Sequence, residues 1–493
     1  MIFLGLDIGS SGCKCIAISE DGTLRASCGR EYPKQPGQIG LDAEVLFSHV
    51  CEVILGCSQK IGDKSQIVSV TVSSFGESFV PVDRSGRTLS DIALYTDNWG
   101  KEETEHLQRT VPGMSRITGA APNSLYALPK MMWLLKDRPD IADRIWKFLQ
   151  IADFIIYRLC GEAVIDYSLS CRSLAFDIDT KNWSGDVLSA AGIRADQLSS
   201  PVPAGSIAGT LRSDLSATLG LPSHTKIVVG AHDQVASAVG AGALRPGEAV
   251  VGTGSVECIT PVYASPILEE NFLRQNYVCI PHAVPGNYVT YAFTLSGGSL
   301  LPWYRDRLAP HLKSAAAEKN RSIYELLDDT CPASSSDVMV IPHFGGTGTP
   351  ELNPSALGTV TGLNMSTGLP EIYRAILEGL CFELCYNREQ LSRFGISFSS
   401  VYATGGGAKS PLWLRLKADI LGIPVAAVET ADAGAMGGAM MAAVSLGTFT
   451  TLTQASEVFV KIKEPVVPDI RESARYAEKY EKYKRVRKAL LPE

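Results

Sequence analysis

Two aspartates, each at the end of a predicted buried strand, are the residues of this sequence best suited to chemistry. Asp7 follows the apolar run 2–6, and Asp233 follows the apolar run 227–230. A carboxylate such as Asp7 can hold the waters of a Mg²⁺ ion, which keeps much of its hydration shell. An acidic residue at a strand end, beside small residues, is where an α/β protein places a reactive group such as a general base. Capping the helix that follows it is the alternative role for Asp233.

Three glycine-rich turns, at 8–14, 252–255 and 404–410, add groups that bind phosphate. Backbone N–H groups of small residues approach phosphate oxygens closely, hydroxyls add donors, and a lysine adds a point charge. An ordinary hairpin turn would use the same residues as the first turn, whereas three glycines opening a helix favour a nucleotide. Phosphoryl transfer needs donors to the phosphate oxygens, a metal site and a base. The turns supply the donors, and the two aspartates supply the metal site and the base. The candidate groups are Ser10, Ser11, Lys14, Thr253, Gly254, Gly406, Gly407 and Ser410.

The elements around these turns predict two α/β domains. Apolar runs at 2–6 and 13–19 give strand, turn, strand, which differs from the strand–turn–helix of a dinucleotide site. The same order of strand, glycine turn and strand returns at 249–260, so we place a domain junction near 240–247. Apolar spacing predicts further strands at 67–72, 79–82, 401–404 and 424–428, and helices at 43–57, 101–110, 129–135, 151–159, 371–394 and 411–421.

Composition restricts the class of protein. The 493 residues carry a net charge of −7 with the signs interspersed, which argues against a nucleic-acid surface. The N-terminus has no signal-peptide pattern, and the apolar run 433–444 is short of the roughly 20 residues that a membrane span needs. We therefore expect a cytoplasmic protein that binds no membrane. Its 12 cysteines have no regular spacing, which predicts reduced, buried thiols, and Tyr476, Tyr480 and Tyr483 share a helical face suited to core packing.

In this order, the motifs resemble the FGGY family of carbohydrate kinases, and most of all its xylulose kinases. The resemblance covers nearly the whole chain. It is strongest in GGGAKSPLWLRLKADILGIPV at 405–425, and continues in the glycine–alanine stretch 433–446. Thr118-Gly119 with Ala127 to Leu134 resembles the family's TG…APKLLWL stretch, and 153–168 resembles the region that follows it.

The resemblance implies an actin-like, ribonuclease H-like fold in each of two domains, with a ligand cleft between them. Residues 1–242 would bind the sugar and residues 243–493 the nucleotide. The enzyme would transfer the γ-phosphate of Mg·ATP to a hydroxyl of a small neutral sugar, a ketopentose such as xylulose first. By position, Asp233 would be the general base and Asp7 would organise Mg²⁺ through water. Phosphates would meet Ser10, Ser11, Lys14, Thr253 and Gly254; the nucleoside would meet Gly406, Gly407 and Ser410; the sugar would meet Glu77, Asp97, Asp233 and Gln234.

Departures from the family's motifs concern the substrate. Glu77 stands where xylulose kinases have His, and Trp99 stands where the family has Arg two residues after the Asp of its W-x-D-x-R motif, here Asp97. Because the loop 73–78 follows a predicted strand, we expect Glu77 to face the cleft. Its carboxylate would accept hydrogen bonds from two sugar hydroxyls and would repel sugar acids. Glycerol kinases share this Glu and the Gln after the base. A kinase for glycerol or gluconate is thus one alternative, and a silent sugar sensor, which would be free to lose Asp233, is another. The oligomeric state stays open, a homodimer included.

Overall fold

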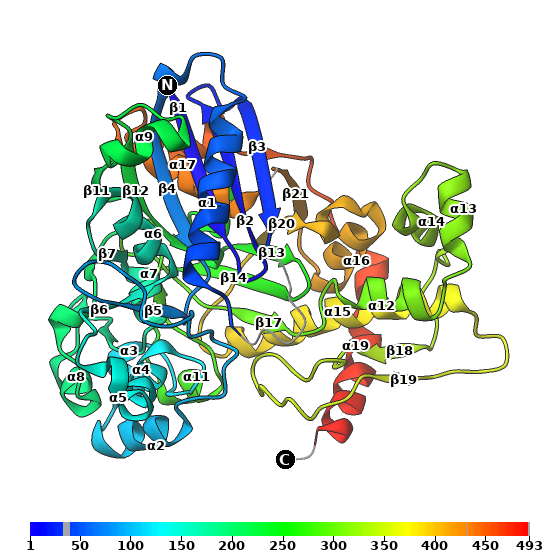
Figure 1. The fold of residues 1–493 in the computed structure, drawn as a ribbon. Coiled ribbons are helices and arrows are strands. Elements are labelled where there is room, and N and C mark those ends of the chain that lie inside the picture. Colours follow the sequence, from blue (N-terminus) through cyan, green and yellow to red (C-terminus); the bar gives the residue numbers. More distant parts are fainter. Residues whose placement is uncertain (33–39, 431, 492–493) are drawn as a thin grey trace.

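A computed structural model describes residues 1–32, 40–430 and 432–491, and shows one large β-sheet in each half of the chain (Figure 1). The first sheet has the strand order β11-β12-β4-β1-β2-β3, with β4 parallel to β1 and to β12. Its strands are β1 (Ile2–Ile8), β2 (Gly12–Ser19), β3 (Leu24–Glu31), β4 (Ile67–Ser74), β11 (Ile207–Thr210) and β12 (Lys226–His232).

Strand β1 is covered on both faces. Leu4 and Leu6 belong to the core that includes α1 (Ala43–Ser58) and α6 (Ile151–Cys160), while Phe3 points to the core of α17 (Ala433–Ser445). This follows from the period of two in a strand, which sends alternate side chains to opposite faces. A Cβ atom on Gly5 would overlap the carbonyl oxygen of Ala435, so only glycine allows α17 to lie this close.

The second sheet follows the order β15-β16-β14-β13-β20-β21-β22, with β17 paired to β14. The glycine turn after β13 and the one after β20 lie side by side, because these two strands are parallel and Thr253 is paired with Gly405. The strands are β13 (Glu248–Thr253), β14 (Glu257–Tyr263), β15 (Ile280–Pro281), β16 (Tyr288–Val289), β17 (Ala292–Thr294), β20 (Ser400–Gly405), β21 (Val425–Glu429) and β22 (Lys461–Ile462).

Helices α10 (Asp233–Gly240) and α17 pack against each other with almost no side chain between them. A Cβ atom on Gly240 would overlap the carbonyl oxygen of Ala433, and one on Gly437 would overlap that of Ala236. The glycine–alanine composition of 433–445 therefore serves a close helix crossing, and α17, from the second half of the chain, covers the first sheet.

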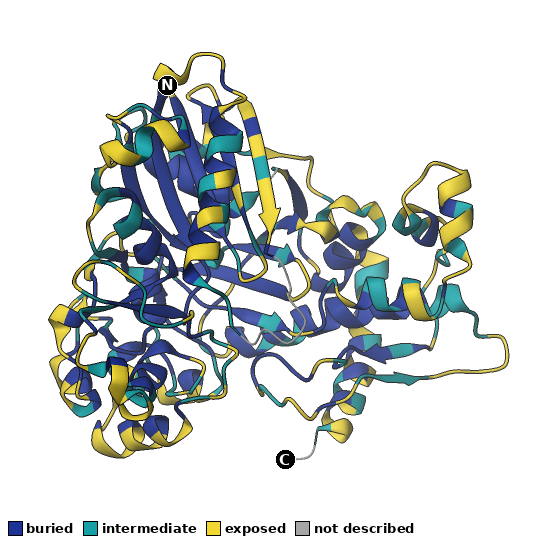
Figure 2. Ribbon diagram, viewed as in Figure 1, coloured by how far each residue is buried: buried dark blue, intermediate teal, exposed yellow. Residues whose placement is uncertain are grey.

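The C-terminal layer consists of three long helices, α15 (Leu369–Ser392), α16 (Pro411–Leu421) and α19 (Ile470–Leu490). Tyr476, Tyr480 and Tyr483 on α19 are buried against Phe382 of α15, which confirms the predicted core role of the three tyrosines. Figure 2 shows that most strands of both sheets are buried, that the edge strand β3 is largely exposed, and that the surrounding helices have exposed outer faces.

Smaller elements complete both halves. In the first half they are β5 (Phe79–Val82), β6 (Lys147–Gln150), β7 (Val164–Asp166), β8 (Phe176–Asp177), β9 (Asn182–Trp183), β10 (Ser200–Val202), α2 (Lys101–Thr110), α3 (Met114–Thr118), α4 (Ala127–Asp137), α5 (Pro139–Ala142), α7 (Tyr167–Cys171), α8 (Gly185–Ala191) and α9 (Ser213–Leu219). In the second they are α11 (Glu270–Arg274), α12 (Leu300–Arg307), α13 (Leu312–Glu318), α14 (Ile323–Thr330), α18 (Leu452–Phe459), β18 (Met339–Ile341) and β19 (Thr359–Thr361). The cysteines are free thiols, as predicted, but only seven of them are buried; Cys28, Cys51, Cys160, Cys331 and Cys385 are partly exposed. Within the described ranges, no helix combines the length and apolar character that a bilayer crossing requires.

Candidate active site

A cavity of about 640 Å³, here called the central cavity, lies between the two halves of the chain. The first half lines it from the turn after β1, the loop after β4 and the start of α10, and the second half from β14, β17 and the loop at Leu352. Ser10, Ser11, Glu77, Asp233 and Gln234, which the sequence predicts for the site, all line this cavity.

Asp233 is the first residue of α10, directly after β12. His232, not Asp233, is the N-cap of this helix, since its Nδ1 accepts a hydrogen bond from the N–H of Gln234. The hydroxyl of Tyr291 lies 3.0 Å from His232 Nδ1, and Asp233 Oδ1 lies 3.1 Å from the same nitrogen. Burial and the nearby charge of Glu77 raise the pKa of Asp233 to about 7. Its side chain is still 29% exposed to the cavity, so this carboxylate can take a proton from a bound hydroxyl at neutral pH.

Glu77 is held by an ion pair that the sequence does not reveal. Its carboxylate accepts hydrogen bonds from the guanidinium of Arg172, which lies over the rings of Tyr126 and Tyr291 at 4.9 and 5.5 Å. Glu77 has a φ of 61°, in the left-handed region that non-glycine residues seldom adopt. Such strain gathers at functional sites, where the surrounding structure fixes it. Glu77 thus faces the cavity as expected, as half of a buried ion pair.

A second cavity, of about 540 Å³, adjoins the first and shares Gly9 and Ser11 with it. Lys14 lies opposite Asp7 across strands β1 and β2, and its ammonium is 3.1 Å from Asp432 Oδ2. Burial and the charges of Asp432 and Asp233 raise the pKa of Asp7 well above its ordinary value. Sequence reasoning missed Asp432; the available signal was an acidic residue directly before the glycine–alanine helix, whose N-cap it forms.

The residues around Asp7 fit a magnesium ion. Asp7 Oδ1 is buried and has no hydrogen-bond partner in the described part of the chain, and neighbouring carboxylates disfavour its charge. A divalent cation bound there would give Asp7 Oδ1 a partner and would offset the repulsion between the carboxylates. No group of three or more metal-binding side chains occurs within the described residues, which is compatible with Mg²⁺ because it is commonly held by one or two carboxylates, waters and substrate phosphates.

The two glycine turns of the second half contact each other. A Cβ atom on Gly407 would come within 3 Å of the side chain of Thr253, so this glycine is needed for the turns to meet. The hydroxyl of Thr253 donates to Glu257 at 2.8 Å and accepts from Lys417 at 3.0 Å. The N–H of Gly254 donates to the carbonyl of Val256, at 3.0 Å.

Two further predicted residues, Ser410 and Asp97, have structural roles in their own segments. Ser410 is the N-cap of α16 and donates to Asp328 Oδ2 at 2.6 Å, close to the three glycines. Asp97 accepts the N–H of Leu94 at 2.8 Å in its own turn, and of this segment it is Tyr95 that lines the central cavity. Trp99, at the position of the family's Arg, stacks on Trp133 with ring centroids 4.5 Å apart.

Comparison with known proteins decides the family. Residues 2–240 match the N-terminal domain of the FGGY family of carbohydrate kinases, and residues 247–446 match its C-terminal domain. This chain belongs to the FGGY family. It is therefore an ATP-dependent sugar kinase, a phosphotransferase that acts on an alcohol group.

Relatives of this FGGY kinase cover almost its entire length. It is 26% identical to a xylulose kinase of Bacillus subtilis over 500 residues, 98% of this chain and 96% of the relative. It is 27% identical to an autoinducer-2 kinase of Yersinia enterocolitica, over 96% of this chain and 92% of that one. A ligand-bound xylulose kinase structure from Lactobacillus acidophilus has a TM-score of 0.88 at 24% identity, covering 99% of this chain and 98% of that one. The predicted fold, with two actin-like, ribonuclease H-like domains, is thereby confirmed.

Proposed function

We propose that this kinase phosphorylates a small neutral sugar or polyol, a ketopentose such as xylulose first, and that Asp233 is its general base. The observation that carries the proposal is a carboxylate with a pKa near 7 in the central cavity, next to the cluster of Asp7, Lys14 and Asp432. A base near neutrality is matched to proton removal at working pH.

In the proposed reaction, a sugar hydroxyl oxygen forms a bond to the γ-phosphorus of ATP. The bond from that phosphorus to the bridging oxygen breaks, and ADP leaves with the electron pair. Asp233 takes the hydroxyl proton. Lys14 and the N–H groups of the first turn meet the phosphate oxygens. Mg²⁺, held by Asp7 through water, would neutralise phosphate charge when bound.

We assign the sugar to residues 1–242 and the nucleotide to residues 243–493. All the charged side chains that line the central cavity come from the first part, whereas the paired glycine turns come from the second. The nucleotide is then surrounded by Thr253, Gly254, Gly406, Gly407 and Ser410. Glu77 accepts hydrogen bonds from sugar hydroxyls, and the amide of Gln234 donates or accepts them. Asp97 takes part only if its turn opens, because its carboxylate now caps Leu94.

A neutral acceptor is favoured over a sugar acid by the charge of the lining. The central cavity carries two carboxylates, Glu77 and Asp233, against one guanidinium, that of Arg172. A like charge in a partly desolvated pocket disfavours binding. Gluconate remains the competitor to test, since a gluconokinase of Bacillus licheniformis is 26% identical over 92% of this chain.

A panel of sugars with coupled detection of ADP tests the proposal. Ketopentoses, ketohexoses, glycerol and aldonates are compared at equal concentration with Mg·ATP, and EDTA and sugar-free reactions are the controls. We expect sugar-dependent ADP release with a neutral ketose, abolished by EDTA. Preference for an aldonate, or ADP release with none of the neutral sugars, would refute the proposed substrate class.

A further inference from the structure

The two walls of the central cavity differ in chemistry. The wall from the first half carries Glu77, Arg172 and Asp233, together with the amides of Asn123 and Gln234. The wall from the second half contributes no charged side chain among the described lining residues. Its members are Val256, Cys258, Asn276, Tyr277, Val278, Tyr291, Phe293, Leu295 and Leu352.

Three polar groups of this second wall, two hydroxyls and one amide nitrogen, already have hydrogen-bond partners. The hydroxyl of Tyr277 donates to Asn387 at 2.9 Å, and that of Tyr291 lies 3.0 Å from His232 Nδ1. The amide nitrogen of Asn276 donates to the carbonyl of Pro350 at 2.8 Å. The wall therefore offers a bound molecule mainly carbon surface, which a sugar hydroxyl cannot use for hydrogen bonds.

Three apolar side chains of the cavity remain exposed to solvent. Leu125 is 37% exposed, Val256 39% and Leu295 38%, although most large apolar residues of this chain are buried. The backbone at Leu125 is fixed from below, because the buried ammonium of Lys130 binds its carbonyl at 2.7 Å. Apolar side chains gathered in a cavity with a few polar groups are typical of a ligand site.

Leu352 is presented to the same cavity by a strained and well-supported loop. Its φ of 49° lies in the left-handed region, and its N–H donates to the carbonyl of Gly348 at 2.8 Å. The preceding residue, Glu351, is held by two hydrogen bonds from Arg487, at 2.7 and 2.8 Å. A strained conformation with this much support indicates a selected position for the Leu352 side chain.

We propose that the acceptor is an amphipathic sugar: its hydroxyl-bearing part meets Asp233 and the Glu77–Arg172 pair, and an alkyl terminus packs on the second wall. The methyl group of a 6-deoxyketohexose is the simplest such terminus. Val256, Phe293, Leu295 and Leu352 form the surface that receives it. This inference rests on the proposed function. Within its class of small neutral sugars, it places a 6-deoxyketohexose ahead of xylulose, whose terminal carbon carries a hydroxyl.

The test compares matched sugars on the full-length enzyme. Each 6-deoxyketohexose is assayed beside the parent ketohexose of identical configuration, with a ketopentose as reference. We expect kcat/KM to be at least about tenfold higher for the deoxy sugar, since a hydroxyl placed on the apolar wall loses its hydrogen bonds.

Two variants locate the effect. Leu295→Asn should bring the ratio of the two kcat/KM values close to one, and because this side chain is partly exposed the variant should fold. The control is Leu357→Asn, at a leucine that is 78% exposed and does not line the cavity; it should keep the wild-type ratio.

The outcomes separate the inference from the proposed function. Equal kcat/KM for the deoxy and parent sugars, with turnover present, would overturn the amphipathic substrate and leave the neutral-sugar kinase standing. A deoxy preference that survives unchanged in Leu295→Asn would also overturn the assignment to this wall. If no neutral sugar of the wider panel is turned over, both proposals fail together.

Discussion

Carboxylates are buried both around the central cavity and in the contact between α15 and α19. Among the described residues, Asp7 and Asp233 around the cavity lack the Lys or Arg partners that Glu378 and Glu383 have between the helices. In this contact, Glu378 pairs with Arg374 of its own helix at 2.8 Å and with Lys479 of α19 at 2.6 Å, and Glu383 pairs with Arg487 of α19 at 2.8 Å. In and beside the central cavity, by contrast, Asp7 and Asp233 each leave a buried oxygen without a hydrogen-bond partner in the described chain.

The pKa values follow this difference. Burial alone would raise the pKa of Glu383, but the charge of Arg487 and contact with His343 lower it to about 2. Burial and the charge of Glu77 instead raise the pKa of Asp233 to about 7. Compensated charges hold α19 in place, whereas uncompensated charges are available to a proton, a cation or a substrate.

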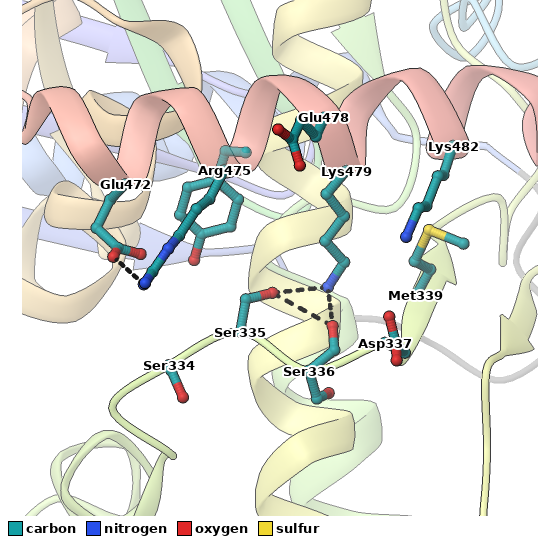
Figure 3. A pocket seen from close by; sticks show the side chains of 11 residues that line it. Ser334, Ser335, Ser336, Asp337, Met339, Glu472, Arg475, Glu478, Lys479 and Lys482 are labelled. Atoms are coloured by element: carbon teal, nitrogen blue, oxygen red, sulfur yellow. Dashed lines mark hydrogen bonds and ion pairs between the residues drawn. The ribbon is translucent and has the colours of Figure 1, made fainter.

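A surface cavity lined by charged residues is not a ligand site when those charges are already paired. A surface cavity of about 330 Å³ lies beside α19 and is lined by Arg475, Lys479 and Lys482 (Figure 3). The ammonium of Lys479 donates hydrogen bonds to Ser335 Oγ and Ser336 O, each at 2.8 Å, and to Glu378. Its charge joins the 331–337 loop to the helix and is not free for an anion.

The largest expected effect is on turnover in Asp233→Asn. Removing the proposed base should lower kcat by about 10²–10⁴ while ATP and sugar still bind, because only proton transfer is lost. Steady-state kinetics and equilibrium binding of both substrates measure this. Asp186→Asn, the same change in the exposed first turn of α8, is the control and should leave kcat unchanged. Near-wild-type kcat in Asp233→Asn would contradict the assignment of the base.

The next effect is on stability in Arg487→Met. The substitution leaves the carboxylate of Glu383 buried without its arginine partner, which costs about 3–5 kcal/mol of unfolding free energy. Chemical denaturation followed by fluorescence measures it. Arg485→Met, at an exposed position on the same helix, should change the free energy by less than about 0.5 kcal/mol. Equal stability of the two variants would remove the distinction between compensated and uncompensated charges.

The smallest effect is on pH dependence, where the two carboxylates should act with opposite signs. The folded-state pKa of Asp233 is raised, so the wild type should lose stability relative to Asp233→Asn as pH rises from about 4 to about 7. We expect a difference of about 2 kcal/mol, roughly half of a full conversion at 1.36 kcal/mol per pKa unit, because water reaches this carboxyl.

Glu383 supplies the opposite case. Its folded-state pKa is lowered, so its contribution to stability is present above the ordinary value and is lost as pH falls from about 4 towards 2.

The pKa of Asp233 should also appear in the reaction rate. We expect kcat/KM for the sugar to rise with pH and to level off above about 7. A kcat/KM that stays constant between pH 5 and 8 would refute the assignment of a pKa near 7 to Asp233 as the base.

Local patterns predicted much of the fold and part of the site. Strand ends and glycine turns led to Asp7, Asp233 and Gly406, because hydrophobic period and turn composition are local properties of a sequence. The partners of these groups were not predictable in the same way. Arg172 lies 95 residues from Glu77, and Lys417 lies 164 residues from Thr253. Such pairs exist only once the chain is folded, and they decide whether a polar side chain faces a ligand or another residue.

The covering of β1 by α17 has a consequence for how the chain is made. Phe3 belongs to the core that contains Ala435 and Ala439, more than 400 residues later in the sequence. At about 5–20 residues per second, a ribosome needs roughly 20 to 90 s to synthesise that interval. During this time strand β1 lacks the helix that covers one of its two faces. A nascent chain that ended before residue 433 would keep that apolar face exposed, so we expect it to be a substrate for chaperones and a source of aggregation.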